Sequence, residues 1–322
     1  MKKIFVFLKE EIFFVLSMKK ILSLFLGIFL TYSVIGHAKL MYYNECTPSN
    51  DLKEYYKQIL SSDKFKVSED RIKKLDVYSK KVNETLCMYY IDAQSFNIDS
   101  PEMFYLFADN NYIYPSVVDL KNNIELKSLM KTKIEKFNID YSAGVKMFNN
   151  TSDNNMAVFL SLECPYCGYL YQFLTTYFQF AQTQNLQLNT DVRLFLMSND
   201  PSKTEFFTKV AKADTDLFTE LLYDYFSNQK FKESGEQIKK EYAEKVKDLN
   251  LPSDVNSTTK NMLTEFNKLN TNGTPVTIIN GKMIVGANLG LLSYILKTEK
   301  ITDIDEITKK MKEHNEKVNK QE

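Results

Sequence analysis

The sequence predicts two folded units, an N-terminal α+β unit and a C-terminal α/β domain that contains a helical insertion. Three observations lead to this fold class. A strand–turn–strand pattern ends near residue 114, an apolar run at 156–162 precedes an amphipathic helix and a second strand, and residues 202–270 have helical periodicity without a strand pattern. A chain of 322 residues is long enough to bury a core in each unit.

The first 38 residues have the pattern of an export signal. Two lysines precede the apolar run at 21–35, and Ala38 ends a small-residue cleavage pattern. The run is short for a transmembrane helix, although retention as a membrane anchor is the alternative to cleavage. The Met-Lys-Lys-Ile motif of the first four residues recurs at Met18, which is a second candidate start. In either case the remaining chain faces an oxidising compartment.

Residues 39–120 are expected to form the N-terminal unit, in which a short helix at 51–60 packs on a meandering antiparallel sheet. Apolar and aromatic residues predict the strands of that sheet at 65–67, 85–91, 103–108 and 112–114. A helix of about four turns over 124–137 follows, so residues 121–155 are expected to be a linker helix and linker.

Residues 156–300 are expected to form the C-terminal domain. The run at 156–162 suits a central strand buried on both faces. A helix separates this strand from the next one at 192–197, so the two strands should be parallel.

After the helical insertion, at about 202–270, the chain is expected to return to the sheet. Asn280-Gly281 between two apolar runs predicts a hairpin, because both residues tolerate the positive φ of such a turn. A last core helix follows at 289–296, and residues 301–322 are expected to be a charged tail that is either a solvated helix or frayed.

Charge and histidine content exclude several classes of function. The chain has 41 basic and 41 acidic residues, so it lacks the basic excess of a nucleic-acid-binding protein. The two histidines, His37 and His314, lie in the signal and in the tail, so a histidine metal site or histidine catalysis has almost no residues to use. Gly168, where histidine would be needed, excludes the covalent haem motif.

Cys164-Pro165-Tyr166-Cys167 stands between the apolar strand and the following helix and is the candidate catalytic motif. The unpaired N–H groups of a helix start favour a thiolate, so the pKa of Cys164 is expected to be low. Pro165 suits the first helical position. Cys167 falls one turn later, where it could resolve a mixed disulfide formed by Cys164. The motif therefore predicts a redox-active dithiol that needs no bound cofactor.

Two other interpretations of the motif are weaker. A zinc site would need two further ligands, and Cys46 and Cys87 are not a close pair. A purely structural disulfide between Cys164 and Cys167 would close a very small loop and remove little chain entropy. Glu163, next to the first cysteine, could raise its pKa by like charge, or it could be an ordinary solvated loop residue.

The motif after an apolar strand, together with Gly273-Thr274-Pro275-Val276 before a hairpin, resembles the thioredoxin superfamily. Within this superfamily, the sequence most resembles the DsbC/DsbG family of periplasmic disulfide isomerases. Thr274 and residues 104–120 carry this closer resemblance. The latter resemble the strand–turn–strand of that family's cystatin-like dimerisation domain. The resemblance implies that Pro275 is cis and lies against the sulfurs. It also implies that Thr274, Pro275 and Tyr166 contact the substrate.

The resemblance implies a thiol–disulfide oxidoreductase that works as a homodimeric isomerase or reductase in the periplasm of a Gram-negative bacterium. Its partners would be proteins with non-native disulfides or oxidised cysteines, and a membrane electron donor of the DsbD type. Two alternatives stay open. One is a DsbA-like oxidase, which the long insertion at 202–270 favours, and the other is a dimeric holdase chaperone without enzymatic activity.

The remaining cysteines depart from the family pattern. No cysteine follows Cys167, so the second disulfide sometimes found in the catalytic domain of the family is absent. Cys46 and Cys87 both fall in the N-terminal unit, and we expect them to form a structural disulfide. The alternative is a buried free Cys87 with a flexible Cys46.

Overall fold

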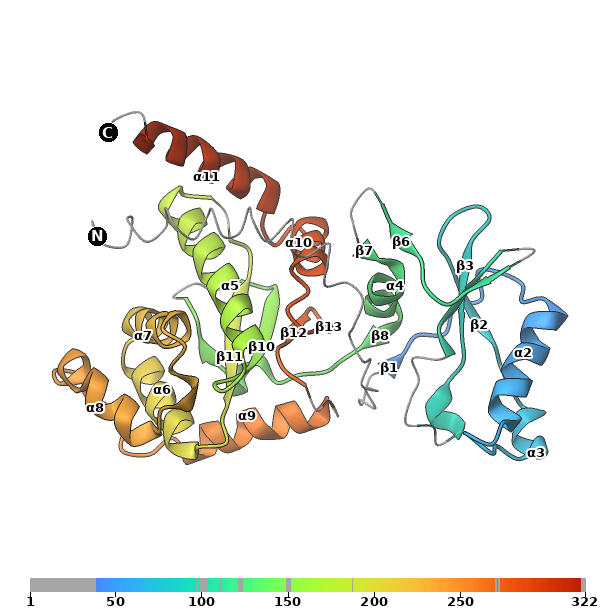
Figure 1. Ribbon diagram of the computed structural model, residues 1–322, viewed down its shortest axis with the longest axis horizontal. Helices are drawn as coiled ribbons and strands as arrows, with labels where there is room; N and C mark the ends of the chain where they lie inside the picture. The colour runs from blue at the N-terminus through green and yellow to red at the C-terminus, as the bar shows by residue number, and fades with distance from the viewer. Residues whose placement is uncertain are drawn as a thin grey trace.

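The computed structural model describes most of the chain after residue 38, namely residues 39–96, 98, 104–109, 112–120, 124–148, 152–186, 188–269, 271 and 273–319. The expected export signal at 1–38 lies outside these residues. Figure 1 shows two lobes, with the N-terminal strands and helices in one and the longer C-terminal domain in the other. Helix α4 lies between the two lobes.

The N-terminal lobe contains mostly short elements. In chain order these are β1 (Lys39–Leu40), α2 (Asn50–Ser61), α3 (Glu69–Ile72), β2 (Tyr78–Lys81), β3 (Cys87–Tyr90), η1 (Ala93–Phe96), β4 (Leu106–Ala108), β5 (Ile113–Tyr114), β6 (Val118–Asp119), β7 (Ile124–Glu125), α4 (Leu126–Ile134) and β8 (Glu135–Lys136).

The main sheet of this lobe is an antiparallel meander in the order β2-β3-β4-β5. Successive side chains of a strand point to opposite faces of the sheet. Met88, Tyr90 and Phe107 pack with Ile134 of α4, whereas Tyr89 belongs to the cluster that includes the buried face of α2. The sheet is therefore covered by α2 on one face and by α4 on the other.

One expected strand of this lobe is wrong. Residues 65–67 form no strand, because Lys66 adopts a φ of 51°, which interrupts an extended backbone. The first strand of the meander is instead β2, which the sequence pattern did not reveal. Helix α2 also begins earlier than expected, since Ser49 is its N-cap and accepts a hydrogen bond from the Leu52 N–H at 3.1 Å.

The expected linker helix is shorter than four turns and is packed against both lobes. Short strands flank α4, since β7 pairs with β6, and β8 pairs with β1 with Leu40 opposite Glu135. Met130 is buried against the N-terminal sheet, and Leu129 belongs to the large core of the C-terminal domain. Helix α4 thus connects two cores.

The C-terminal domain contains the longer elements. These are η3 (Tyr141–Ala143), β9 (Val145–Lys146), β10 (Asn155–Ser161), α5 (Pro165–Thr183), β11 (Asp191–Met197), α6 (Pro201–Ala213), α7 (Thr215–Ser227), η4 (Lys230–Lys232), α8 (Gly235–Val246), α9 (Asn256–Lys268), β12 (Val276–Ile279), β13 (Lys282–Val285), α10 (Leu289–Thr298) and α11 (Ile304–Asn319).

These strands form one sheet in the order β13-β12-β10-β11-β9. Strands β10 and β11 are parallel, as the strand–helix–strand pattern predicted, and the other pairs are antiparallel. The hairpin between β12 and β13 turns at Asn280 and Gly281, whose φ values are 49° and 79°. Strand β9 lies in the expected linker, so the sheet begins earlier in the chain than residue 156.

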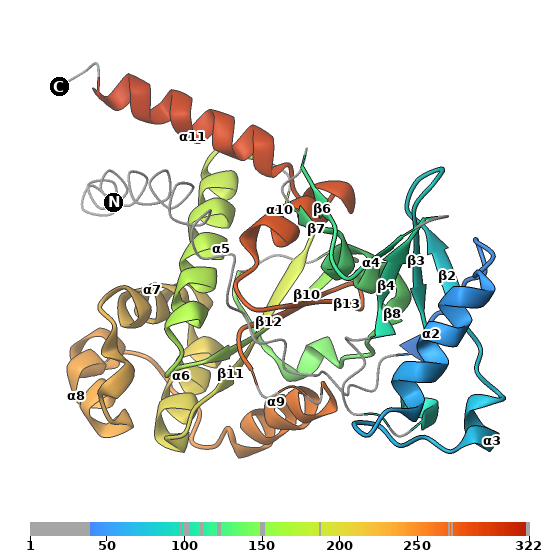
Figure 2. The same cartoon turned by 45° about the vertical axis from the view of Figure 1, so that its right-hand side comes forward.

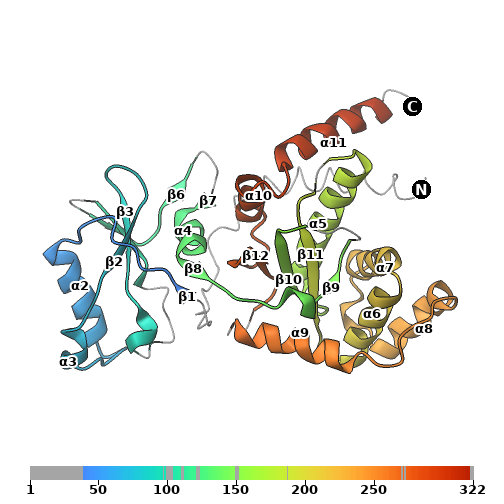
Figure 3. The same cartoon turned by 180° about the vertical axis from the view of Figure 1, so that it is seen from behind.

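Helices cover both faces of this sheet. Val158 and Leu160 of β10 pack in the cluster that contains the apolar residues of α5, α7 and α10. Phe159 faces the other way and packs with Met262 of α9. Four of the helices, α6 to α9, make up the predicted helical insertion; Figures 2 and 3 show α6, α7 and α8 gathered on the side of the sheet away from the N-terminal lobe.

The charged tail, expected to be a solvated helix or frayed, is the helix α11, and one of its faces contributes to the core. Ile304, Ile307 and Met311 of α11 are buried in the cluster that also contains Phe178 of α5. Their spacing of three and four residues puts them on one face of the helix. The charged residues between them occupy the outer face, which explains why the segment has a polar composition.

Candidate active site

Cys164 stands at the N-cap of α5, just beyond the end of the central strand β10. Pro165 opens the helix, as expected for a residue without an N–H group. The Cys167 N–H donates to the Cys164 carbonyl at 3.0 Å, which closes the first turn. The Cys164 sulfur is therefore placed at the positive end of the helix dipole.

Cys167 lies one turn further along the helix, and its environment differs from that of Cys164. Its side chain is fully buried, whereas Cys164 is partly exposed. The Ser161 N–H donates to the Cys167 Sγ atom at 3.3 Å. Both cysteines are free thiols in this structure.

The two sulfurs have opposite pKa shifts. A hydrogen bond from Cys167 lowers the pKa of Cys164 to about 6, against the opposing effect of partial burial. The N–H groups of Cys167 and Tyr166 and the side chain of Thr274 contribute in the same direction. Burial, together with the neighbouring Cys164, raises the pKa of Cys167 well above its ordinary value. Cys164 is thus suited to attack and Cys167 is kept as a thiol.

Thr274 and Pro275, far away in sequence, lie beside the dithiol. The Cys164 Sγ atom is 3.4 Å from the Thr274 carbonyl oxygen. The Thr274–Pro275 peptide bond is cis, as the resemblance implied. The Pro275 carbonyl accepts a hydrogen bond from the Gly286 N–H at 2.8 Å, which ties this loop to the end of β13.

Two tyrosines on the first turns of α5 lie on the surface next to the dithiol. Tyr166, between the cysteines, is 53% exposed, and Tyr169 is 41% exposed. Their ring centroids are 6.3 Å apart in an edge-to-face arrangement. Tyr169 was missed in the sequence. Its spacing of three residues from Tyr166 on a predicted helix was the available signal.

The Glu163 carboxylate is held on the side of the loop that meets α6. It accepts hydrogen bonds from the Ser198 hydroxyl at 2.5 Å and from the Lys203 ammonium at 3.3 Å. Lys203 is only 3% exposed. Sequence reasoning missed it, because a lysine in a charged helical segment has the pattern of a solvated residue.

Cys46 and Cys87 form a disulfide that is structurally separate from the dithiol. It joins the segment before α2 to strand β3, with the two Cα atoms 6.6 Å apart. Both cysteines pack against the core that α2 shares with the N-terminal sheet. A structural disulfide is consistent with folding in an oxidising compartment.

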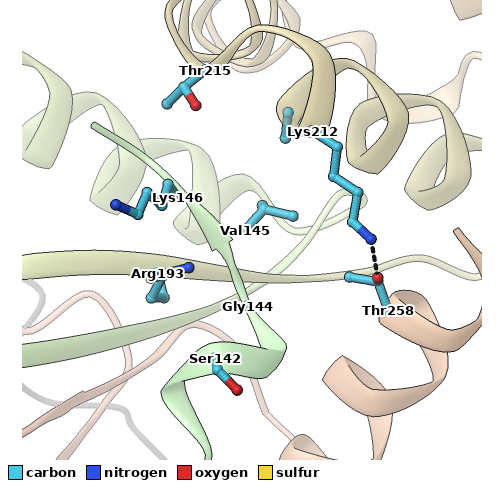
Figure 4. Close-up of a pocket in the computed structure, with 9 residues that line it drawn as sticks. Ser142, Gly144, Val145, Lys146, Arg193, Lys212, Thr215 and Thr258 are labelled. Atoms are coloured by element: carbon cyan, nitrogen blue, oxygen red, sulfur yellow. Dashed lines mark hydrogen bonds between the residues drawn. The ribbon is translucent and has the colours of Figure 1, made fainter. Parts of the chain in front are cut away.

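A pocket of about 290 Å³ lies at the β9 edge of the sheet (Figure 4). Its charged lining residues are Lys146, Arg193 and Lys212. Arg193 is engaged by Asp191 through an ion pair of 2.9 Å, and Lys212 donates to the Thr258 hydroxyl at 2.5 Å. None of the residues predicted from the sequence to form the active site lines this pocket.

The residues that the structure describes contain neither a metal site nor a membrane-spanning helix. Within them, no group of three or more histidine, cysteine, aspartate or glutamate side chains is arranged to hold a metal ion. No helix among them is long and apolar enough to cross a membrane.

Comparison with known proteins places the dithiol in a recognised kind of domain. Residues 146–291 match the family model described as thioredoxin. No curated protein matches the sequence significantly.

Several solved structures are similar to part of the chain at low identity. ScsC of Proteus mirabilis in a transitional conformation is 19% identical over 50% of this chain and 73% of its own, with a TM-score of 0.40. BdbD of Bacillus subtilis is 14% identical over 51% of this chain and 96% of its own, with a TM-score of 0.38. A periplasmic thioredoxin-like protein of Salmonella enterica serovar Typhimurium is 17% identical over 49% and 90%, with a TM-score of 0.39.

The assignment of the domain depends on the family match and on the geometry of the dithiol. The match covers β10, the Cys164–Cys167 pair, the insertion and the Thr274–Pro275 loop. Residues 146–291 therefore form a thioredoxin-like domain, and the Cys164–Cys167 pair within it is the dithiol of a thiol–disulfide oxidoreductase.

Proposed function

We propose that the chain is an exported disulfide isomerase or reductase for proteins that carry non-native disulfides or oxidised cysteines. One observation carries the proposal: the partly exposed Cys164 has a low pKa while the buried Cys167 is held as a thiol. At neutral pH the first sulfur is available for attack, and the second is slow to displace a bound substrate. A long-lived mixed disulfide gives the substrate time to rearrange.

The reaction begins when the Cys164 thiolate attacks one sulfur of a substrate disulfide. A Cys164–substrate bond forms, the substrate disulfide breaks, and the other substrate sulfur leaves as a thiolate. In isomerisation another thiolate of the substrate then attacks the substrate sulfur that is bonded to Cys164. A new substrate disulfide forms, the mixed disulfide breaks, and Cys164 leaves as a thiolate. In reduction Cys167 loses its proton and attacks the Cys164 sulfur, so the substrate leaves reduced and the Cys164–Cys167 pair is oxidised.

The substrate is proposed to lie across the surface that Tyr166 and the Thr274–Pro275 loop share. An extended peptide could hydrogen-bond to the Thr274 backbone while its side chains contact the exposed tyrosine ring. This arrangement would hold the substrate disulfide near Cys164. The contact between Cys164 and Thr274 supports it.

Refolding of a protein with scrambled disulfides tests the proposal. Cys164→Ser should abolish the acceleration of refolding, because the attacking sulfur is lost. If the variant were as effective as the unsubstituted protein, the enzyme proposal would fail and a holdase chaperone would remain.

A DsbA-like oxidase is the second candidate, and the long insertion formed by α6 to α9 favours it. The oxidase motif commonly has histidine at the place of Tyr166, and without it the reduced thiolate loses a stabilising group. The redox state of the Cys164–Cys167 pair in the cell separates the two. A mostly reduced pair supports the isomerase or reductase, and a mostly oxidised pair supports the oxidase.

The proposal includes a homodimer, the periplasm of a Gram-negative bacterium, and a DsbD-type membrane donor that returns two electrons to the oxidised pair. The N-terminal lobe supports the dimer, since β5 is an edge strand and Tyr112 and Ile113 are exposed there. Residues 104–120, which resemble the cystatin-like dimerisation domain, include this strand. A monomer by light scattering would contradict the dimer.

A further inference from the structure

Lys203 is a buried cation close to the dithiol, and the mechanism above leaves it without a role. It lies in the first turn of α6 and is 3% exposed. Its ammonium group donates to the Phe231 carbonyl at 2.9 Å, to Glu163 Oε1 at 3.3 Å and to the Tyr225 hydroxyl at 3.4 Å. A buried lysine is costly unless its charge is compensated, and Glu163 is the carboxylate that it contacts.

The Glu163 carboxylate is oriented by further contacts. Its two oxygens accept hydrogen bonds from the hydroxyl groups of Ser198 at 2.5 Å and Ser161 at 3.2 Å. The Ser161 N–H is the group that donates to the Cys167 sulfur. The ion pair is therefore connected, through one serine, to the buried thiol, while Glu163 is the residue directly before the attacking cysteine.

Tyr225 of α7 also holds the loop that leads into Cys164. Its hydroxyl donates to the Leu162 carbonyl at 2.7 Å and lies within reach of Lys203. Leu162 and Glu163, the two residues before Cys164, are thus tied to two different helices of the insertion. The insertion supports the loop that presents the nucleophile.

The surrounding charges show why a cation is needed here. Burial raises the pKa of Tyr225, and the neighbouring acids Glu163, Glu233 and Asp200 raise it further. Asp200 is engaged by the Gly235 N–H at 2.7 Å and by the Ser202 hydroxyl at 2.6 Å. Together with Glu163, the other two acids would disfavour the Cys164 thiolate, because neighbouring negative charges oppose the ionisation of a thiol. Lys203 is a buried positive charge that pairs with Glu163.

We propose that Lys203 is a positioning residue for the dithiol: it neutralises Glu163 and holds its carboxylate at the start of α6, so that the negative charge does not oppose the Cys164 thiolate. This role of Lys203 rests on the proposed oxidoreductase function, because it concerns the reactivity of the same dithiol. Lys203 itself touches neither sulfur in the contacts described above.

A charge cycle on the reduced full chain tests this role. The rate of Cys164 alkylation by iodoacetamide is measured against pH for Lys203→Met, Glu163→Gln and the double variant. Lys203→Met leaves an uncompensated carboxylate, so the pKa of Cys164 should rise by about half a unit to one unit. At pH 6 its alkylation should be about twofold to fivefold slower. Glu163→Gln should lower the pKa, and the double variant should return near the starting value.

Lys209→Met is the matched control, because Lys209 lies on the same helix and pairs with Glu205 at 2.7 Å. It should leave the pH profile unchanged. Shifts of the same sign in both single variants would indicate a structural effect and overturn the proposal, as would an unchanged profile. If Lys203→Met does not fold, the Glu163→Gln variant alone tests the proposal. An unchanged or raised pKa of Cys164 in that variant would contradict the role of Lys203. The alkylation measurement needs no protein substrate, so its failure can be distinguished from a failure of the refolding test.

Discussion

The Sγ atom of Cys164 lies 3.4 Å from the carbonyl oxygen of Thr274, although 110 residues separate the two in sequence. The sheet creates this proximity, because β10 leads to Cys164 and pairs with β12, with Phe159 opposite Val276. The Cys164 loop and the Thr274–Pro275 loop therefore leave the sheet side by side. In the proposed function, a substrate bonded to the Cys164 sulfur would therefore lie beside the Thr274 backbone.

Replacement of the second cysteine should trap the substrate. In Cys167→Ser the Cys164 thiolate can still attack a disulfide, but the thiol that releases the reduced substrate is missing. We expect a mixed disulfide between the variant and a scrambled substrate protein to accumulate, visible as an added mass on non-reducing gels. The Cys164→Ser variant is the control and should give no adduct. Equal adducts in both variants would assign the nucleophile elsewhere.

The reactivity of Cys164 should titrate well below that of an ordinary thiol. Its pKa is lowered to about 6 by the hydrogen bond from Cys167 and by the N–H groups of the helix start. Alkylation of the reduced protein should therefore reach half its maximal rate near pH 6 and level off above neutral pH. The same protein unfolded in urea should need a pH near the ordinary thiol value. If alkylation of the folded protein reached half its maximal rate only above pH 8, the Cys164 thiolate would not be stabilised by the contacts described for it.

The same shift predicts how stability depends on pH. Because the pKa of Cys164 falls from 9.0 unfolded to about 6 folded, the unfolded chain binds more protons between these values. The stabilisation is fully present above the unfolded pKa and is lost as the pH falls through about 6. The urea midpoint of the reduced protein should thus rise with pH across this window. The oxidised protein, which lacks both thiols, is the control, and a parallel change in both forms would contradict the assignment.

The parts of the fold that were predicted correctly depend on local pattern. The continuous apolar run of β10 and the helical spacing after Cys164 indicated a parallel strand pair, and Asn280-Gly281 indicated the hairpin turn. Each signal is contained in a few consecutive residues. The Cys164–Thr274 contact itself was available only through the resemblance, because no local pattern shows which loops meet.

The parts that were missed depend on contacts between distant residues. Lys203 looked solvated, yet Glu163 and the Phe231 carbonyl compensate its burial, and neither is a neighbour in sequence. The expected strand at 65–67 does not form, because Lys66 adopts a left-handed backbone conformation. The segment of helix α11 was expected to be solvated because it is highly charged, although its described apolar residues all lie on one face.

The α11 segment should contribute measurably to stability. Ile307 is 1% exposed and packs in the core cluster of the C-terminal domain. Ile307→Ala should lower the free energy of unfolding by about 2–5 kcal/mol, the range for truncating a buried isoleucine. Lys309→Ala, two residues further along and 77% exposed, should change it by less than about 0.5 kcal/mol. Urea unfolding monitors both. Equal, small effects would mean that α11 does not pack on α5 in solution.

Removal of the Cys46–Cys87 disulfide should destabilise the N-terminal lobe and leave the chemistry of the dithiol intact. The bond links residues 41 apart, so its loss should free chain entropy worth about 3–4 kcal/mol in the unfolded state. The double variant Cys46→Ala, Cys87→Ala avoids a new free thiol, and urea unfolding measures the loss. Its alkylation profile at Cys164 should match that of the unsubstituted protein, because Cys46 and Cys87 pack in a different core. A shifted profile would show that the two lobes are coupled through α4.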